Sequence, residues 1–189
     1  MLSKHSYIAK IIIVASLLGL LSSCGFRLRG DVEVPTVLAS VHIAGVAEYA
    51  DLNQELRRVL QRSGSQITKT RETAKSVINI SGEQWRKRVL SVDTQGRAAE
   101  YELNYRFMFL VEEVSTDELK DADKPVSTVV LVSQQKIDLT RDFRFDPNNV
   151  LATEAEEKQI RLEMVRFAVR QMMRRIRSSL KYSADKSPG

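Results

Sequence analysis

Basic side chains on both sides of one predicted turn are the residues of this sequence best suited to chemistry, namely the binding of an anion such as phosphate. An arginine can hold a phosphate group through two parallel hydrogen bonds, and a lysine holds it as a point charge. A turn at residues 93–96 would bring the strands before and after it side by side. Whether residues near 141 join them depends on strand register. The candidate anion-binding residues are Arg86, Lys87, Arg88, Arg97 and Arg141.

The same charges have a second explanation. Charged residues on an edge strand keep it from pairing with other chains, and the run from Arg86 to Arg88 would protect an otherwise apolar strand from aggregation in this way. Composition leaves both explanations open. The arginines near the C-terminus are expected to form a solvated helix face; they are Arg170, Arg174, Arg175 and Arg177.

Residues 1–23 have the three-part order of a secretory signal peptide. Lys4, His5 and Lys10 form a positive head, residues 11–21 form an apolar run, and small residues follow. The run is too short to remain as a transmembrane helix, which needs about 20 apolar residues. We therefore predict a signal peptide over residues 1–23.

Cys24 is the single cysteine of the chain, so no internal disulfide can form. Leu21-Ser22-Ser23-Cys24 resembles the bacterial lipobox, in which the thiol receives a diacylglycerol and the freed amine an acyl chain. Three acyl chains give stable anchoring, because each buried CH₂ contributes ~0.8 kcal/mol. We predict both modifications on Cys24. Gly25, in place of aspartate, favours the outer membrane by resemblance to enterobacterial sorting. The alternative is a soluble secreted protein with a coincidental cysteine.

Catalytic residues are sparse in the predicted mature chain. His42 is its one histidine and lies in a short apolar segment, where a packed or edge role is expected. A zinc site needs several histidine or cysteine ligands, and no nucleophile-elbow or phosphate-loop pattern is present. We predict no enzyme activity and no cofactor other than the covalent lipid.

Composition favours one folded domain. The chain has 189 residues, of which 43% are hydrophobic and 28% charged, and its net charge is +5. Without the two leader lysines the surplus falls to +3, which does not argue for nucleic-acid binding. After the signal peptide we predict a lipidated tether over residues 24–37, a single α+β sandwich domain over residues 38–182, and a disordered tail over residues 183–189.

Hydrophobic periodicity predicts six elements in the order β-α-β-β-β-α. The strands are expected over residues 37–43, 76–92, 99–114 and 126–145, and the first helix over residues 49–63. The second helix is expected to begin at a capping box of Thr153 and Glu156. We expect two helices packed on one face of a four-stranded mixed, mostly antiparallel sheet.

The strand over residues 99–114 has the clearest alternation of apolar and polar side chains. Its predicted core face carries Tyr101, Leu103, Tyr105, Phe107, Phe109 and Val111. Its predicted solvent or partner face carries Glu100, Glu102, Asn104 and Arg106. A bulge is expected at Gly82 in the preceding strand.

Over nearly its whole length the precursor resembles the LptE family of lipopolysaccharide-assembly lipoproteins. The resemblance depends on the order and spacing of several short motifs and on the acidic-to-basic final helix. The motifs are residues 24–30 (CGFRLRG), 90–93 (LSVD), 96–103 (GRAAEYEL), 140–143 (TRDF) and 148–152 (NNVLA).

The resemblance implies a function that periodicity does not show. Members of the family plug the lumen of a large outer-membrane β-barrel, LptD, assist its assembly, and bind lipopolysaccharide delivered across the periplasm. It implies an outer-membrane protein, lipid-anchored on the periplasmic side. The family's basic contacts lie near the hairpin turn and the start of the last helix, where this chain has Thr94-Gln95 and Thr153-Glu154. Lipopolysaccharide contacts here must therefore come from the five candidate residues.

Two other classes of function remain compatible with the sequence. One is a lipid-anchored scaffold of another outer-membrane complex without lipopolysaccharide binding. The other is a lipid-anchored periplasmic enzyme, which the sparse catalytic residues disfavour. Co-purification of a large barrel would separate the enzyme from the others, and lipopolysaccharide binding would separate the first two.

Overall fold

The computed structural model describes residues 36–115 and 128–186, within the unit spanning residues 33–189. The predicted signal peptide and Cys24 lie outside the described residues. The elements are a 3₁₀ helix η1 (Thr36–Leu38), β1 (Ser40–Ala44), α2 (Asp51–Arg62), β2 (Gln66–Ile67), β3 (Ser76–Val92), β4 (Ala98–Val114), β5 (Thr128–Arg144) and α3 (Val150–Lys186).

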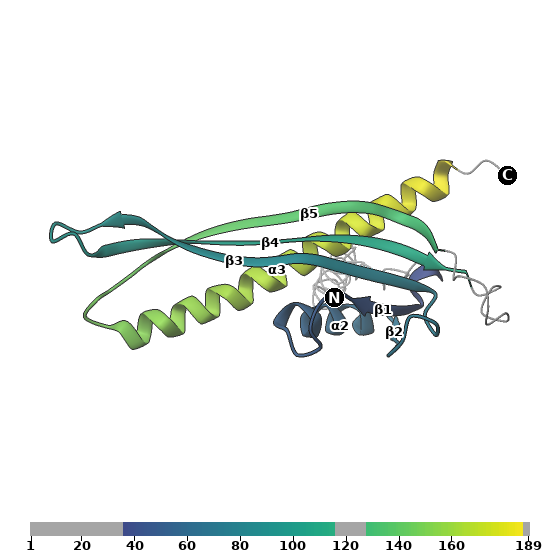
Figure 1. The fold of residues 1–189 in the computed structure, drawn as a ribbon, viewed down its shortest axis with the longest axis horizontal. Helices are drawn as coiled ribbons and strands as arrows, with labels where there is room; N and C mark the ends of the chain where they lie inside the picture. The colour runs from purple at the N-terminus through teal and green to yellow at the C-terminus, as the bar shows by residue number, and fades with distance from the viewer. Residues whose placement is uncertain (1–35, 116–127, 187–189) are drawn as a thin grey trace, which may run out of the picture. The chain divides into compact units, whose positions relative to one another are not determined.

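One sheet in the order β2-β1-β3-β4-β5 organises the domain (Figure 1). β1 is parallel to β2 and β3, and β3, β4 and β5 pair antiparallel. The α+β class and the mixed, mostly antiparallel sheet are confirmed. The predicted count of four strands is wrong, because β2 adds a fifth. It has two residues, too few for a periodic pattern to indicate.

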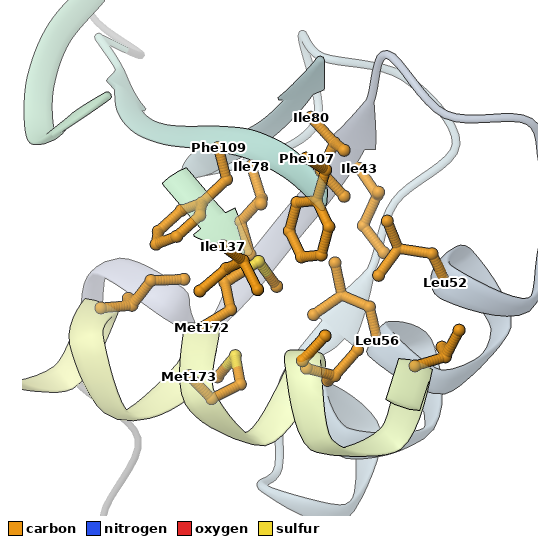
Figure 2. Packing of buried hydrophobic residues seen from close by; sticks show 14 of the residues in the cluster. Ile43, Leu52, Leu56, Ile78, Ile80, Phe107, Phe109, Ile137, Met172 and Met173 are labelled. Atoms are coloured by element: carbon orange, nitrogen blue, oxygen red, sulfur yellow. The ribbon is translucent and has the colours of Figure 1, made fainter. Parts of the chain in front are cut away.

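The odd-numbered face of β4 is buried as predicted. Tyr105 and Leu103 are fully buried and Phe107 is 1% exposed. α2 and α3 both cover this face, and Figure 2 shows Phe107, Phe109 and Ile137 of the sheet packed towards the side chains of the helices. The helical contributors include Leu52, Leu56, Leu60, Val165, Val169, Met172, Met173 and Ile176.

Two predicted details of α3 are wrong. The helix begins at Val150, so Thr153 lies inside its first turn and is not a cap. The Thr153 hydroxyl donates to the carbonyl of Asn149 at 3.1 Å and accepts from the backbone N–H of Asp146 at 3.4 Å. The helix also continues to Lys186, so residues 183–186 are helical and not a disordered tail. The last three residues lie outside the described part.

A bulge in β3 changes which residues face the helices. Ser81 is opposite Met108 and Gln84 is opposite Arg106, so three steps along β3 match two along β4. Gly82, with a φ of 64°, takes the left-handed conformation that such a bulge requires. Upstream, Ile78 and Ile80 face the core. Downstream, the odd-numbered residues take that face, starting with Trp85 opposite the buried Tyr105.

Candidate functional site

Arg86 and Arg88 lie on the sheet face away from the helices, which we call the outer face. They are opposite Asn104 and Glu102 of β4. The Arg88 guanidinium donates two hydrogen bonds to the Glu102 carboxylate, at 2.6 and 2.9 Å. These bonds lower the pKa of Glu102 and raise that of Arg88. Arg86 is exposed and, among the described residues, has no hydrogen bond or ion pair.

Arg97 lies in the turn between β3 and β4. Its Nε is 2.8 Å from Oδ2 of Asp93, whose other oxygen accepts the backbone N–H groups of Gln95 and Arg97. The hydrogen bond from the Arg97 backbone is the main cause that lowers the pKa of Asp93. The predicted turn is confirmed, and Arg97 helps to build it.

Lys87 points to the opposite side, towards α3. Its Nζ is 2.5 Å from Oε2 of Glu157 on α3, and 4.2 Å from the centroid of the Tyr101 ring. Glu157 also accepts hydrogen bonds from Arg161, whose guanidinium lies 4.7 Å from the Trp85 ring. Lys87 therefore connects β3 to the first half of α3.

Arg141 is also on the helix-covered face. It and Lys87 are opposite Leu103 from its two sides in the sheet. Arg141 borders a groove of about 130 Å³ with Met164 and Phe167 of α3. Within the described part of the chain, Arg141 has no hydrogen bond or ion pair.

The five candidate residues therefore do not form one cluster. Arg86 and Arg88 lie on the outer face, Arg97 lies in the turn, and Lys87 and Arg141 lie on the helix side. Three of them, Lys87, Arg88 and Arg97, already have a carboxylate partner. The strands on the two sides of the turn pair as predicted, but this pairing does not bring the five side chains together.

Two cations that the sequence reasoning did not select border a larger groove on the outer face. Arg106 and Lys136, with Met108 and the bulge residues, line a space of about 480 Å³. Arg106 donates to the Gln84 side-chain carbonyl at 2.9 Å. Lys136 pairs with Asp138, and hydrogen bonds from Lys136 and Asn104 lower the pKa of that carboxyl. The alternation of apolar and polar side chains in residues 99–114 predicts that Arg106 lies on this face, and this was the sequence signal that could have identified it.

His42 has a structural contact. Its Nδ1 lies 3.3 Å from the carbonyl oxygen of Thr68, which follows β2.

Among residues 36–115 and 128–186, no group of three histidine, cysteine, aspartate or glutamate side chains could hold a metal ion. Of the helices described, none is long and apolar enough to cross a membrane.

Partial burial would by itself raise the pKa of Glu157, but hydrogen bonds from Lys87 and Arg161 outweigh it and lower that pKa. A lowered folded-state pKa stabilises the fold above the unfolded value of about 4.3, and this stability is lost as pH falls through the folded value. We expect Glu157→Gln to cost about 1–2 kcal/mol at pH 7, since hydrogen bonds to charged groups contribute ~1.5–3 kcal/mol before screening. The cost should shrink below about pH 4.

Unfolding curves of both proteins from pH 7 to pH 3 measure this difference. Glu154→Gln is the matched control, because Glu154 is exposed in the same helix and makes no ion pair with a described residue. A cost for Glu157→Gln that stays constant over the whole pH range would contradict the role assigned to the ionised carboxylate.

The α+β fold and this two-faced sheet are shared with known bacterial lipoproteins. Over residues 38–176 the sequence matches the model of the LptE family, described as lipopolysaccharide-assembly, and the chain belongs to that family. Family membership confirms that the protein is not an enzyme, and it is an envelope lipoprotein of lipopolysaccharide assembly.

Relatives and solved structures agree with this assignment. The chain is 27% identical to the LPS-assembly lipoprotein LptE of Photorhabdus laumondii over 157 residues, 82% of this chain and 78% of the relative. It is 28% identical to that of Pectobacterium atrosepticum, over 82% of this chain and 77% of the relative. The solution structure of lipoprotein B from Nitrosomonas europaea superposes with a TM-score of 0.60 at 28% identity, over 85% of this chain and 93% of that one.

Proposed function

We propose that the mature chain is an outer-membrane lipoprotein on the periplasmic side that plugs the LptD β-barrel, assists its assembly, and binds lipopolysaccharide during assembly at the cell surface. The observation that carries the proposal is the family match over residues 38–176, which include all five strands and most of α3. The acyl chains predicted on Cys24 would provide the anchor.

The outer face of the β3–β4 hairpin supports the lipopolysaccharide part. Arg86 has no carboxylate partner among the described residues, and the Arg88 side chain is 69% exposed although it pairs with Glu102. An anionic phosphate can bind a free guanidinium directly and can compete for an exposed one, because exposed ion pairs are weak. The phosphates of lipid A have this chemistry.

One observation favours the alternative, a scaffold without lipopolysaccharide binding. Lys87, Arg88 and Arg97 are each neutralised within the chain. Because these cations are paired with carboxylates of the chain, their charge needs no anionic ligand to neutralise it. Lipopolysaccharide binding requires the outer-face arginines, whereas a scaffold does not. A binding experiment can therefore separate the two functions.

Replacing Arg86, Arg88 and Arg97 together with glutamate is expected to abolish lipopolysaccharide binding and to leave capture of the barrel intact. Each charge-assisted hydrogen bond contributes ~1.5–3 kcal/mol before screening, or about tenfold or more in affinity. The mature lipoprotein would be titrated with purified lipopolysaccharide, and LptD recovery would be measured after co-expression.

A charge swap controls for the loss of internal pairs. Arg88→Glu combined with Glu102→Arg keeps the pair and the net charge but reverses its direction, and Arg86→Glu alone removes a cation without breaking a described pair. Unchanged lipopolysaccharide affinity in the folded triple variant would exclude these three arginines as lipopolysaccharide contacts. Absence of lipopolysaccharide binding by the wild type would favour the scaffold. Absence of LptD from wild-type preparations would refute the plug.

A further inference from the structure

The solvent-facing side of α3 has a row of cations around an exposed aromatic ring. Phe167, Arg170, Arg174 and Lys181 are spaced by three, four and seven residues, which places them on one face of a helix. All four are exposed, and the core-facing side of the same helix carries Val169, Met172 and Ile176. The cations extend over about 16 Å, at a rise of ~1.5 Å per residue.

These cations have no carboxylate partner in the described part of the chain. The sequence from residue 164 to residue 184 contains no acidic residue. The guanidinium carbons of Arg170 and Arg174 lie 5.8 and 6.0 Å from the centroid of the Phe167 ring. Several arginines elsewhere in the domain are paired with carboxylates; they include Arg57, Arg58, Arg71, Arg88, Arg97 and Arg161.

The fold does not account for this row. Arg175 and Arg177 of the same helix have structural contacts, since they donate to the carbonyl of Lys136 and to the hydroxyl of Ser63. The helix dipole favours cations only in the last turn, and Arg170 and Arg174 are 16 and 12 residues before the end of α3 at Lys186. Phe167 is 45% exposed, which leaves much of a large apolar ring in water.

We propose that Phe167, Arg170, Arg174 and Lys181 form a docking surface for an acidic protein partner, with carboxylates opposite the cations and an apolar site for the ring. Arginine and aromatic residues are enriched in protein interfaces, where they supply much of the binding energy. A phosphate group needs donors that converge on one point, whereas these cations are spread along a single convex helix. Carboxylates distributed over a folded surface match that spacing.

The inference rests on the proposed function, because the partner tested is the LptD barrel. The full-length lipoprotein would be co-expressed with LptD, extracted in detergent, and recovered through an affinity tag. The variant Arg170→Glu/Arg174→Glu/Lys181→Glu is expected to recover at least about tenfold less barrel, because three attractive contacts become repulsive. Phe167→Ala is expected to reduce recovery without a change of charge. Wild-type capture should weaken between about 0.1 M and 1 M salt, where the Debye length falls from ~10 to ~3 Å.

The variant Arg62→Glu/Lys69→Glu/Lys75→Glu is the matched control. It makes the same change in charge at exposed residues that have no ion pair with a described residue. Equal loss in the control would reduce the effect to net charge and overturn the inference. Full recovery by the α3 variant would also overturn it, while leaving the proposed function intact. Loss of lipopolysaccharide binding with full barrel recovery would assign the surface to phosphate, again against the inference. Absence of barrel with the wild type would refute the proposed function itself.

Discussion

Replacing Cys24 with alanine is expected to remove the protein from the outer-membrane fraction. Without the thiol no diacylglycerol can be attached, and the chain should accumulate as uncleaved precursor or in a soluble form. The physical reason is the large number of buried methylene groups in three acyl chains, at ~0.8 kcal/mol each. Fractionation and intact mass measurement of the extracted protein test the prediction.

Ser23→Ala provides the control for this experiment, since it keeps a small residue before the cysteine and should not affect anchoring. The finding that would contradict the lipobox interpretation is a Cys24→Ala protein of the correct mature mass in the outer-membrane fraction.

Phe107→Ala is expected to cost ~3–5 kcal/mol of unfolding free energy, as large-to-small changes in a packed core do. Phe107 is 1% exposed and packs in the cluster between sheet and helices. The neighbouring Met108 lies on the outer face and is 38% exposed, so Met108→Ala should cost much less. Urea unfolding of the two variants, monitored by circular dichroism, compares the faces directly. A similar cost at both positions would contradict the assignment of the buried face.

The parts of the fold that the sequence predicted are those with a long periodic signal. β3, β4 and β5 lie within two residues of the predicted ranges, because each has 17 residues and two distinct faces. β1 was predicted to begin three residues too early, since Val37 and Leu38 belong to η1. β2 was missed because pairing with β1 alone makes it a strand, and such pairing has no local pattern.

The capping box illustrates a different limit. A threonine three residues before a glutamate is a good starting signal, but the helix already begins at Val150, directly after Asn148-Asn149. The backbone N–H of Asn148 donates to the Asp146 side chain at 2.9 Å, which forms a turn just before Val150. Thr153 then bonds backward within the helix. Whether the threonine hydroxyl caps the helix or bonds backward to a carbonyl depends on the conformation of the preceding loop, and the motif alone does not predict that conformation.

The candidate residues were predicted by type but not by face. The sequence indicated a strand with basic residues and a bulge at Gly82, and the structure contains both. The partners of Lys87 and Arg88 are Glu157, 70 residues away, and Glu102 on the next strand. Strand register and tertiary packing determine those ion pairs, and neither can be predicted from the spacing of residues in the sequence.

The bulge at Gly82 makes the far half of the hairpin sensitive to residue count. Because side chains alternate with a period of two, one extra residue reverses the parity of every position between the bulge and the next irregularity. The insertion places Trp85 and Lys87 under α3 and leaves Arg86 and Arg88 in solvent. Single substitutions at the two arginines leave this frame unchanged. Deletion of one residue between Ser81 and Gln84 would instead shift the frame, turning two guanidinium groups towards α3 and an indole outward. In this strand, the number of residues is a stricter constraint than their identity.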